Sequence, residues 1–126
     1  MPDPLDDRGL PADYALDPER ETTPRDVKAR LDAGENLLLI DCRQPHEHDL
    51  VRLDHSVLIP LPEREDHFAN ELAGQEDREV VVYCRSGMRS LTFVDFLRER
   101  GFTNARSMAG GINLWNTDIE PGGLTY

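Results

Sequence analysis

Cysteine, lysine and long hydrophobic runs are all scarce in this sequence. Its two cysteines, Cys42 and Cys84, are too few for a disulfide framework and show neither Cys-x-x-Cys nor zinc-ligand spacing. With Lys28 the only lysine, the net charge of −11 argues against nucleic acid and anionic membranes as partners. No apolar run approaches the roughly 18 residues of a transmembrane helix, and the acidic N-terminus does not resemble a secretory signal. We therefore expect a cytoplasmic protein, and no pattern here predicts a metal or a cofactor.

Short apolar runs alternate with helical patterns along most of the chain. The runs predict strands at 37–40, 56–59, 79–83 and 105–108, and the patterns predict helices at 24–34, 62–74, 88–100 and after 110–111. This alternation predicts an α/β fold with a central, mainly parallel sheet flanked by helices on both faces. We divide the chain into a proline-rich acidic arm (1–20), which wraps the domain or is partly disordered, one domain (21–117) and an irregular tail (118–126).

Cys84 stands where a buried strand runs into a helix. Helix N-termini and nearby arginines favour a thiolate, so we interpret Cys84 as reactive, the alternative being an inert, buried cysteine. Gly87 can take the positive φ that a tight turn requires. Ligands of parallel sheets lie beyond the carboxyl ends of the strands, which is where Cys84, Asp41 and Arg43 are expected. The candidate loop residues are Arg85, Ser86, Gly87, Met88, Arg89 and Ser90.

The loop resembles the Cys-x-x-Gly-x-Arg-Ser pattern of rhodanese-type sulfurtransferases. Three further blocks agree with that family in order and spacing across about residues 21–117. The stretch 39–47 is similar to its Asp-x-Arg-x-x-x-Glu motif, 58–61 to the stretch that follows, and 108–115 to its Gly-Gly-x-x-x-Trp ending. The resemblance implies a three-layer rhodanese-like fold.

The resemblance also implies a mechanism, in which the Cys84 thiolate takes a sulfur atom from thiosulfate or another persulfide. A thiol, cyanide or a protein acceptor then removes that sulfur from the cysteine persulfide. Loop amides would stabilise the persulfide anion. Arg85 and Arg89 are candidates for docking an anionic donor, with bracing of the loop as the alternative for Arg89.

One segment departs from the family. Where the family commonly has Gly-His-Ile-x-Gly-Ala, residues 51–56 read Val-Arg-Leu-Asp-His-Ser, so both glycines and the histidine are replaced. We expect the local backbone there to be rebuilt.

Two other functions compete with sulfur transfer. A cysteine phosphatase or arsenate reductase uses a Cys-x5-Arg loop, but only four residues separate Cys84 from Arg89, and Tyr83 stands where those enzymes usually have histidine. A non-catalytic rhodanese-like module that binds or regulates a partner typically lacks the loop cysteine. Both alternatives are less favoured than the sulfurtransferase.

The remaining polar residues have structural and functional interpretations. We interpret Asp41, Arg43 and Glu47 as an ion network that supports the loop. Cys42 is either a resolving thiol or a small apolar filler, and we favour the filler. A metal site formed by His46, His48 and His55 with the nearby acids is disfavoured, because Pro45 favours a helical turn rather than the extended backbone that places His-x-His rings on one face.

Overall fold

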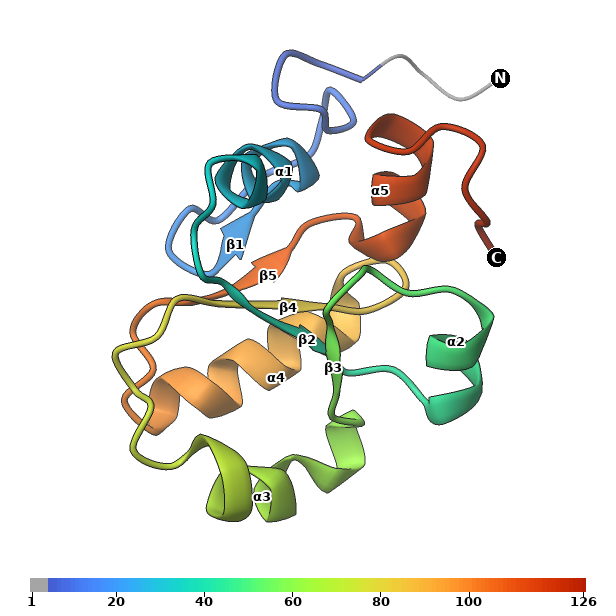
Figure 1. The fold of residues 1–126 in the computed structure, drawn as a ribbon. Coiled ribbons are helices and arrows are strands. Elements are labelled where there is room, and N and C mark those ends of the chain that lie inside the picture. Colours follow the sequence, from blue (N-terminus) through green and yellow to red (C-terminus); the bar gives the residue numbers. More distant parts are fainter. Residues whose placement is uncertain (1–4) are drawn as a thin grey trace.

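The computed structural model describes residues 5–126, which form a five-stranded parallel sheet with helices on both faces (Figure 1). The spatial order is β1-β5-β4-β2-β3, and every pairing of neighbouring strands is parallel. This confirms the predicted fold class. The strands are β1 (Glu21–Thr22), β2 (Leu38–Asp41), β3 (Val57–Leu58), β4 (Val80–Tyr83) and β5 (Ala105–Met108).

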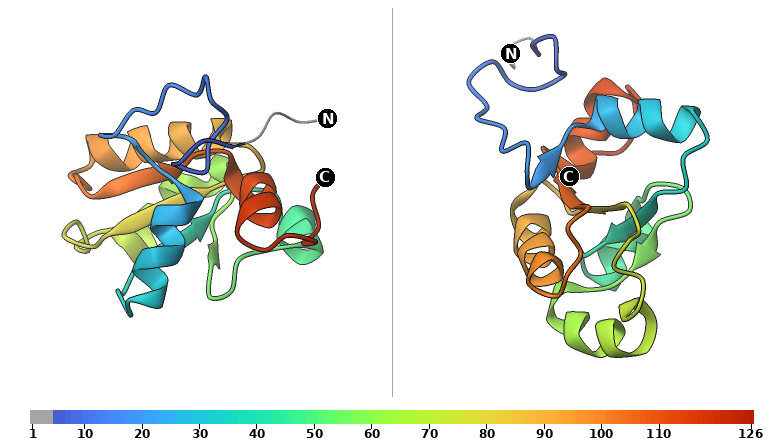
Figure 2. Two further views of the ribbon diagram at one scale, coloured as in Figure 1. Left: turned by 90° about the horizontal axis from the view of Figure 1, so that it is seen from above. Right: turned by 90° about the vertical axis from the view of Figure 1, so that its left-hand side faces the viewer.

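Two helical layers cover the sheet (Figures 1 and 2). One core cluster joins β2 and β4 to α4 and η2, and a second joins the other face of the same strands to α1 and α5. The helices are α1 (Pro24–Asp32), α2 (Pro45–Leu50), α3 (Arg64–His67), α4 (Met88–Glu99) and α5 (Gly111–Asp118), with the 3-10 turn η1 (Leu61–Glu63) and the π-helical segment η2 (Phe68–Leu72).

Apart from Asp41 at the end of β2, the central strands β2 and β4 are apolar because both of their faces are buried. Alternate residues of a strand point to opposite sides of the sheet. Ile40 and its register partner Val82 therefore belong to the core cluster under α4, whereas Leu39 and Val81 belong to the cluster under α1 and α5. Burial on both sides explains why these strands read as continuous apolar runs rather than as alternating ones.

Three parts of the chain differ from the sequence prediction or refine it. The two-residue strand β1 was not predicted; it pairs with β5 at the sheet edge. The helix predicted over 62–74 is divided into η1, α3 and η2. In the predicted arm, Leu10 is fully buried, so the described part packs on the domain, while residues 1–4 lie outside the described residues.

The segment 51–56 keeps one backbone feature that glycine would favour. His55 stands in place of the second glycine of the family pattern, and it adopts a positive φ of 66°, alone among the non-glycine residues described here. Leu53, in place of the isoleucine, is buried. A left-handed conformation is therefore present at position 55 without glycine, and the expected rebuilding of the segment stays a prediction.

The strain at His55 predicts a stabilising substitution. A non-glycine residue pays about 1–2 kcal/mol in the left-handed region, of which glycine's extra unfolded-state entropy offsets about half. We expect His55→Gly to raise the free energy of unfolding by about 0.5–1 kcal/mol, measured by urea denaturation. His46→Gly, in the first turn of α2, is the matched control and should lower it. A loss of stability in His55→Gly would show that the His55 side chain contributes more than its backbone costs.

Candidate functional site

Cys84 lies directly after β4, at the carboxyl edge of the sheet, and its side chain is buried. The loop turns at Gly87, whose φ is 110°, and α4 begins at the next residue. The Gly87 N–H points at the Cys84 Sγ over 3.1 Å, and the Ser90 Oγ lies 3.4 Å from the same sulfur. Ser90 is in turn hydrogen-bonded to Ser107 of β5 over 2.7 Å. The loop and the first turn of α4 thus place hydrogen-bonding groups around the Cys84 sulfur.

This environment lowers the pKa of Cys84 to about 4. The Cys42 thiol beside it makes the largest contribution, burial opposes it, and the Ser90 hydroxyl and the amides of Ser90 and Gly87 add to the lowering. Each of these donors stabilises the charged form of the sulfur. Cys84 is therefore a thiolate at neutral pH, which is the nucleophilic form of cysteine.

The start of α5 holds the cysteine loop from the other side. The Ile112 N–H donates to the Cys84 carbonyl over 2.9 Å, and the Asn113 N–H donates to the Arg85 carbonyl over 3.2 Å. Gly111 makes this approach possible, because a Cβ at that position would lie 2.5 Å from the Cys84 carbonyl oxygen. The late Gly-Gly motif of the sequence thus acts on the cysteine through the loop backbone.

The mouth of the loop is formed by exposed side chains. Arg85, Ser86 and Met88 are exposed, and 75% of Met88 is accessible to solvent. Arg89 turns away to form a two-pronged ion pair with Glu47, with distances of 2.7 and 3.0 Å. Arg89 lowers the pKa of Glu47 to about 2, against the effect of burial, so this carboxylate stays ionised. Of the two arginines, Arg85 is the exposed one, whereas Arg89 is paired with a carboxylate.

A fully buried ion pair supports the edge of the sheet beside the loop. Asp41 and Arg43 are both 0% exposed, and the carboxylate accepts from the Arg43 Nε and Nη2 over 2.8 and 2.7 Å. The His48 Nδ1 lies 2.8 Å from the same carboxylate, and the Tyr83 hydroxyl lies 3.3 Å away. The charged residues expected here are thus brought together as two linked pairs, Asp41–Arg43 and Glu47–Arg89.

Tyr126, which the sequence did not single out, links these two pairs. Its hydroxyl donates to Glu47 over 2.5 Å and accepts from the Arg43 Nη1 over 2.8 Å. The guanidinium of Arg85 lies over its ring, 4.9 Å from the centroid. Asn113 on α5 holds its backbone through two hydrogen bonds. Residues in an irregular tail carry no periodicity, so no sequence signal pointed to this contact.

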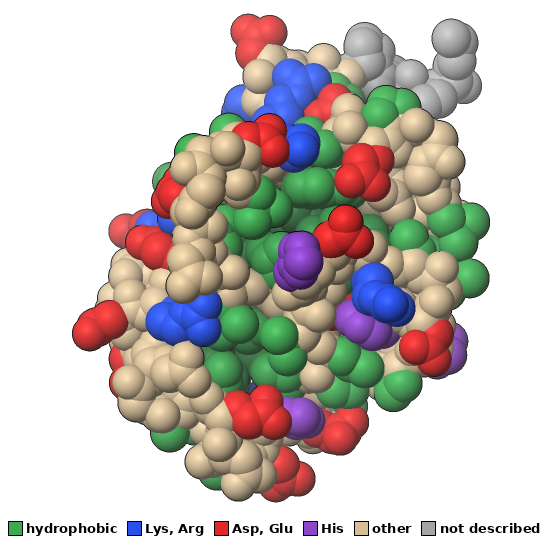
Figure 3. Space-filling model, viewed as in Figure 1, with side chains coloured by type: hydrophobic (Ala, Val, Ile, Leu, Met, Phe, Trp, Pro, Cys, Tyr) green, Lys and Arg blue, Asp and Glu red, His purple; other side chains and the backbone are tan. Residues whose placement is uncertain are grey.

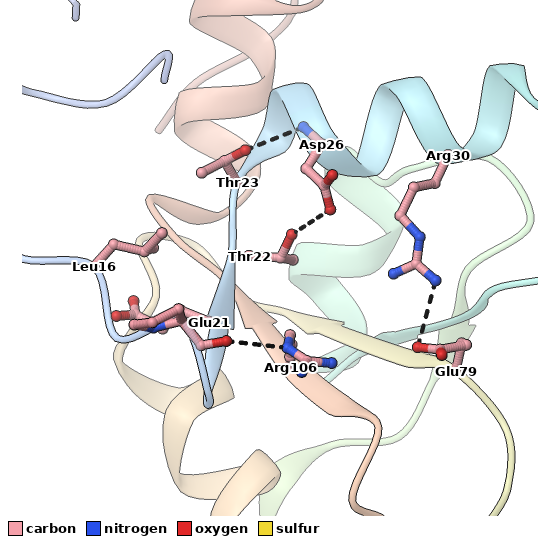
Figure 4. Close-up of a pocket in the computed structure, with 9 residues that line it drawn as sticks. Leu16, Glu21, Thr22, Thr23, Asp26, Arg30, Glu79 and Arg106 are labelled. Atoms are coloured by element: carbon pink, nitrogen blue, oxygen red, sulfur yellow. Dashed lines mark hydrogen bonds and ion pairs between the residues drawn. The ribbon is translucent and has the colours of Figure 1, made fainter. Parts of the chain in front are cut away.

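Two cavities lie away from the cysteine loop. The larger, of about 490 Å³, lies between the end of the arm, β1 and α1 (Figure 4). Its polar groups pair with one another: Asp26 accepts from Thr22 over 2.8 Å, and Arg30 lies 3.4 Å from Glu79. The second, of about 320 Å³, is lined by four leucines and Trp115 and by five charged or polar residues, Lys28, Arg52, Asp54, His55 and Glu120. Hydrophobic side chains are visible in hollows between the charged ones in Figure 3. Neither cavity includes a residue of the loop 84–90.

Among the described residues 5–126, no group of three or more His, Cys, Asp or Glu side chains could hold a metal ion. No helix in the same range is both long and apolar enough to cross a membrane.

The fold and site define an α/β protein with a cysteine thiolate at the carboxyl edge of a parallel sheet. Comparison with known families identifies it further: residues 23–118 match the model of the Rhodanese-like domain. The chain belongs to the rhodanese-like domain family.

The chain is similar to parts of larger curated proteins. It is 34% identical over 122 residues to the adenylyltransferase and sulfurtransferase MOCS3-1 of Zea mays, covering 94% of this chain and 26% of the relative. It is 34% identical over 124 residues to the probable adenylyltransferase/sulfurtransferase MoeZ of Mycobacterium tuberculosis, covering 94% and 30%. The chain thus spans less than a third of the length of these relatives. Their names support sulfurtransferase activity at the level of the family.

Solved structures agree with the fold. A rhodanese-related protein of Thermoplasma volcanium superposes with a TM-score of 0.68 at 28% identity, covering 83% of this chain and 95% of that chain. The human single-domain sulfurtransferase TSTD1 also gives a TM-score of 0.68, at 24% identity, covering 82% and 97%. Single-domain proteins of this size therefore share the architecture.

Proposed function

We propose that the protein is a sulfurtransferase that carries sulfur as a persulfide on Cys84. The observation that carries the proposal is the position of the Cys84 Sγ, 3.1 Å from the Gly87 amide at the start of α4, with a pKa lowered to about 4. The Cys84 thiol in this setting is ionised at neutral pH, and the hydrogen-bond donors around it fix the position of its sulfur. The family match supports the same chemistry.

The proposed reaction has two displacement steps. In the first, the Cys84 thiolate attacks the outer sulfur of thiosulfate or a persulfide, a new S–S bond forms, and sulfite or a thiolate leaves with the electron pair of the broken S–S bond. In the second, cyanide, a thiol or a protein acceptor attacks the outer sulfur, and the Cys84 thiolate is released. Each step conserves charge and needs no further oxidant.

The loop residues have different proposed tasks in this reaction. The amides of Gly87 and Ser90 and the Ser90 hydroxyl stabilise negative charge at the sulfur. Arg85 at the exposed mouth attracts an anionic donor, with Ser86 and Met88 lining its path. Arg89 is occupied by Glu47, so we assign it the bracing role rather than donor docking. Asp41 and Arg43 fix the neighbouring strand end.

The lowered pKa of Cys84 predicts the pH dependence of the first step. The thiolate is the reactive form, so its fraction is complete well above the folded pKa of about 4 and is lost as the pH falls through that value. The single-turnover rate of sulfite release from thiosulfate should therefore stay nearly constant from about pH 8 to pH 5.5. In Cys42→Ala the decline should begin at higher pH, because the largest cause of the shift is absent. A wild-type rate that falls steadily below about pH 8.5, as for a free cysteine, would contradict this.

Sulfite release in the absence and in the presence of an acceptor tests the function itself. With thiosulfate in excess and no acceptor, the protein should release sulfite in stoichiometric amount and then stop, and it should turn over repeatedly when cyanide is present from the start as the acceptor. A chromogenic phosphate ester provides the comparison with a phosphatase, and it should not be hydrolysed. The absence of sulfite release from thiosulfate and from persulfide donors, or robust ester hydrolysis, would overturn the proposal.

A further inference from the structure

Cys42 lies directly across from Cys84 in the sheet. In the parallel pair of β2 and β4, Ile40 is the register partner of Val82 and Asp41 that of Tyr83. The Cys42 N–H donates to the Tyr83 carbonyl over 3.1 Å and continues this ladder one residue further. Cys42 and Cys84 are therefore the next partners in the register.

The two side chains also point to the same side of the sheet. Because strand residues alternate between faces, Cys42 follows Ile40 and Cys84 follows Val82 into the core cluster beneath α4, and both cysteines belong to that cluster. Both are about 1% exposed and neither is in a disulfide. Neighbouring strands lie about 4.7–4.9 Å apart, within the roughly 4.4–6.8 Å that disulfides span between Cα atoms. The Cα spacing expected for these register partners thus falls within the range that a disulfide spans.

The backbone of Cys42 is held on both sides. Besides the bond from its N–H to Tyr83, its carbonyl accepts from the Leu61 N–H over 3.1 Å. These bonds fix the backbone of Cys42 beside Cys84, and both side chains lie in the same core cluster. Arg85 and Ser86 are exposed, so we take the donor to enter from their side, which leaves the core side of the Cys84 sulfur to Cys42.

We propose that Cys42 is a second catalytic residue, which resolves the Cys84 persulfide by attacking its inner sulfur and expelling the outer one as hydrosulfide. This inference rests on the proposed persulfide function. The Cys42–Cys84 S–S bond forms, the bond between the two persulfide sulfurs breaks, and the leaving sulfur takes the electron pair together with the Cys42 proton. The sulfane sulfur is reduced and the cysteine pair is oxidised by two electrons. A low-molecular-weight thiol then regenerates the pair by exchange.

The protonation of the two cysteines fits this sequence of events. The negative charge on Cys84, together with burial, raises the pKa of Cys42, so Cys42 is a thiol while Cys84 is the thiolate. Only Cys84 is then able to attack the donor. Once its charge has moved to the outer sulfur, the Cys42 proton is available to the leaving hydrosulfide.

A single turnover with thiosulfate, without added thiol or cyanide, tests the inference. Wild-type protein should release sulfite and an equal amount of sulfide, and its mass should fall by two hydrogen atoms as the disulfide forms. Cys42→Ala should release sulfite alone and gain one sulfur atom; Cys42→Ser is the second variant, should alanine destabilise the core. Since the chain has only these two cysteines, a monomer on non-reducing electrophoresis assigns the bond.

The outcomes separate the inference from the function on which it rests. A wild-type protein that releases sulfite but no sulfide, and keeps its added sulfur as Cys42→Ala does, would overturn the resolving role and leave sulfur transfer intact. Failure of both proteins to release sulfite would instead overturn sulfur transfer itself. Disulfide-linked dimers in place of the internal bond would also contradict the inference.

Discussion

Cys84→Ser should lower the rate of thiocyanate formation from thiosulfate and cyanide by about 10³-fold or more. Serine preserves the size and the hydrogen bonds of the site, but its hydroxyl is not ionised at neutral pH and cannot hold a transferable sulfur. Loss of the nucleophile that forms a covalent intermediate removes the pathway rather than weakening it. The measurement is kcat/KM in a steady-state assay, with the urea unfolding midpoint recorded for the same sample.

Lys28→Ala is the matched control for this experiment. Lys28 lies on α1 and pairs with Asp32 in an exposed ion pair, outside the cysteine loop, so both activity and stability should change little. A Cys84→Ser protein that is folded and retains a tenth or more of the activity would show that sulfur does not pass through Cys84.

Asp41→Asn should lower the free energy of unfolding by about 3–5 kcal/mol, because it leaves the guanidinium of Arg43 charged, buried and without a carboxylate. Arg43 is 0% exposed, and its remaining partners are the Val51 carbonyl and the Tyr126 hydroxyl. Neither neutral group replaces the ion pair that, with Tyr126, raises the pKa of Arg43 despite its burial. Urea denaturation with a constant m-value measures the loss.

The double variant Asp41→Asn/Arg43→Met provides the control. Removing both charges should recover much of the stability, since a buried ion pair is often replaced by neutral groups at little cost, whereas half of one is not. The difference between the double variant and the sum of the single ones gives the coupling energy. A loss below about 1 kcal/mol in Asp41→Asn would show that water or the tail compensates Arg43.

The sheet and the loop were predictable from the sequence because both depend on local patterns. The apolar runs of β2 and β4 are long enough to indicate buried strands, and Cys84, Gly87 and Arg89 lie within six residues of one another. The carboxyl ends of parallel strands share one edge, which correctly placed Asp41 and Arg43 near the cysteine.

The missed features depend on contacts between distant residues. The strand β1 has only two residues, Glu21 and Thr22, and exists because β5 offers an edge with which to pair. Tyr126 reaches Glu47 across 79 positions of sequence. Ser107 joins the site only because β5 lies next to β4. No short-range signal marks these residues.

The role of Cys42 could not be decided from its position in the sequence alone. Its place at the end of β2 was evident, and a filler was the favoured interpretation because cysteine often fills small apolar space. The strand order decides which residue faces it, and the order β4-β2 places Cys84 there. Cys42 is therefore a candidate for a role in the reaction at Cys84.

Locating the transferred sulfur tests the central claim most directly. The Cys42→Ala protein contains a single cysteine, so it should be incubated with thiosulfate, measured by intact mass and then digested without reductant. We expect one added sulfur atom, found on the peptide that contains Cys84 and removed by cyanide as thiocyanate. An unchanged mass, or added sulfur that cyanide does not remove, would contradict a persulfide on Cys84.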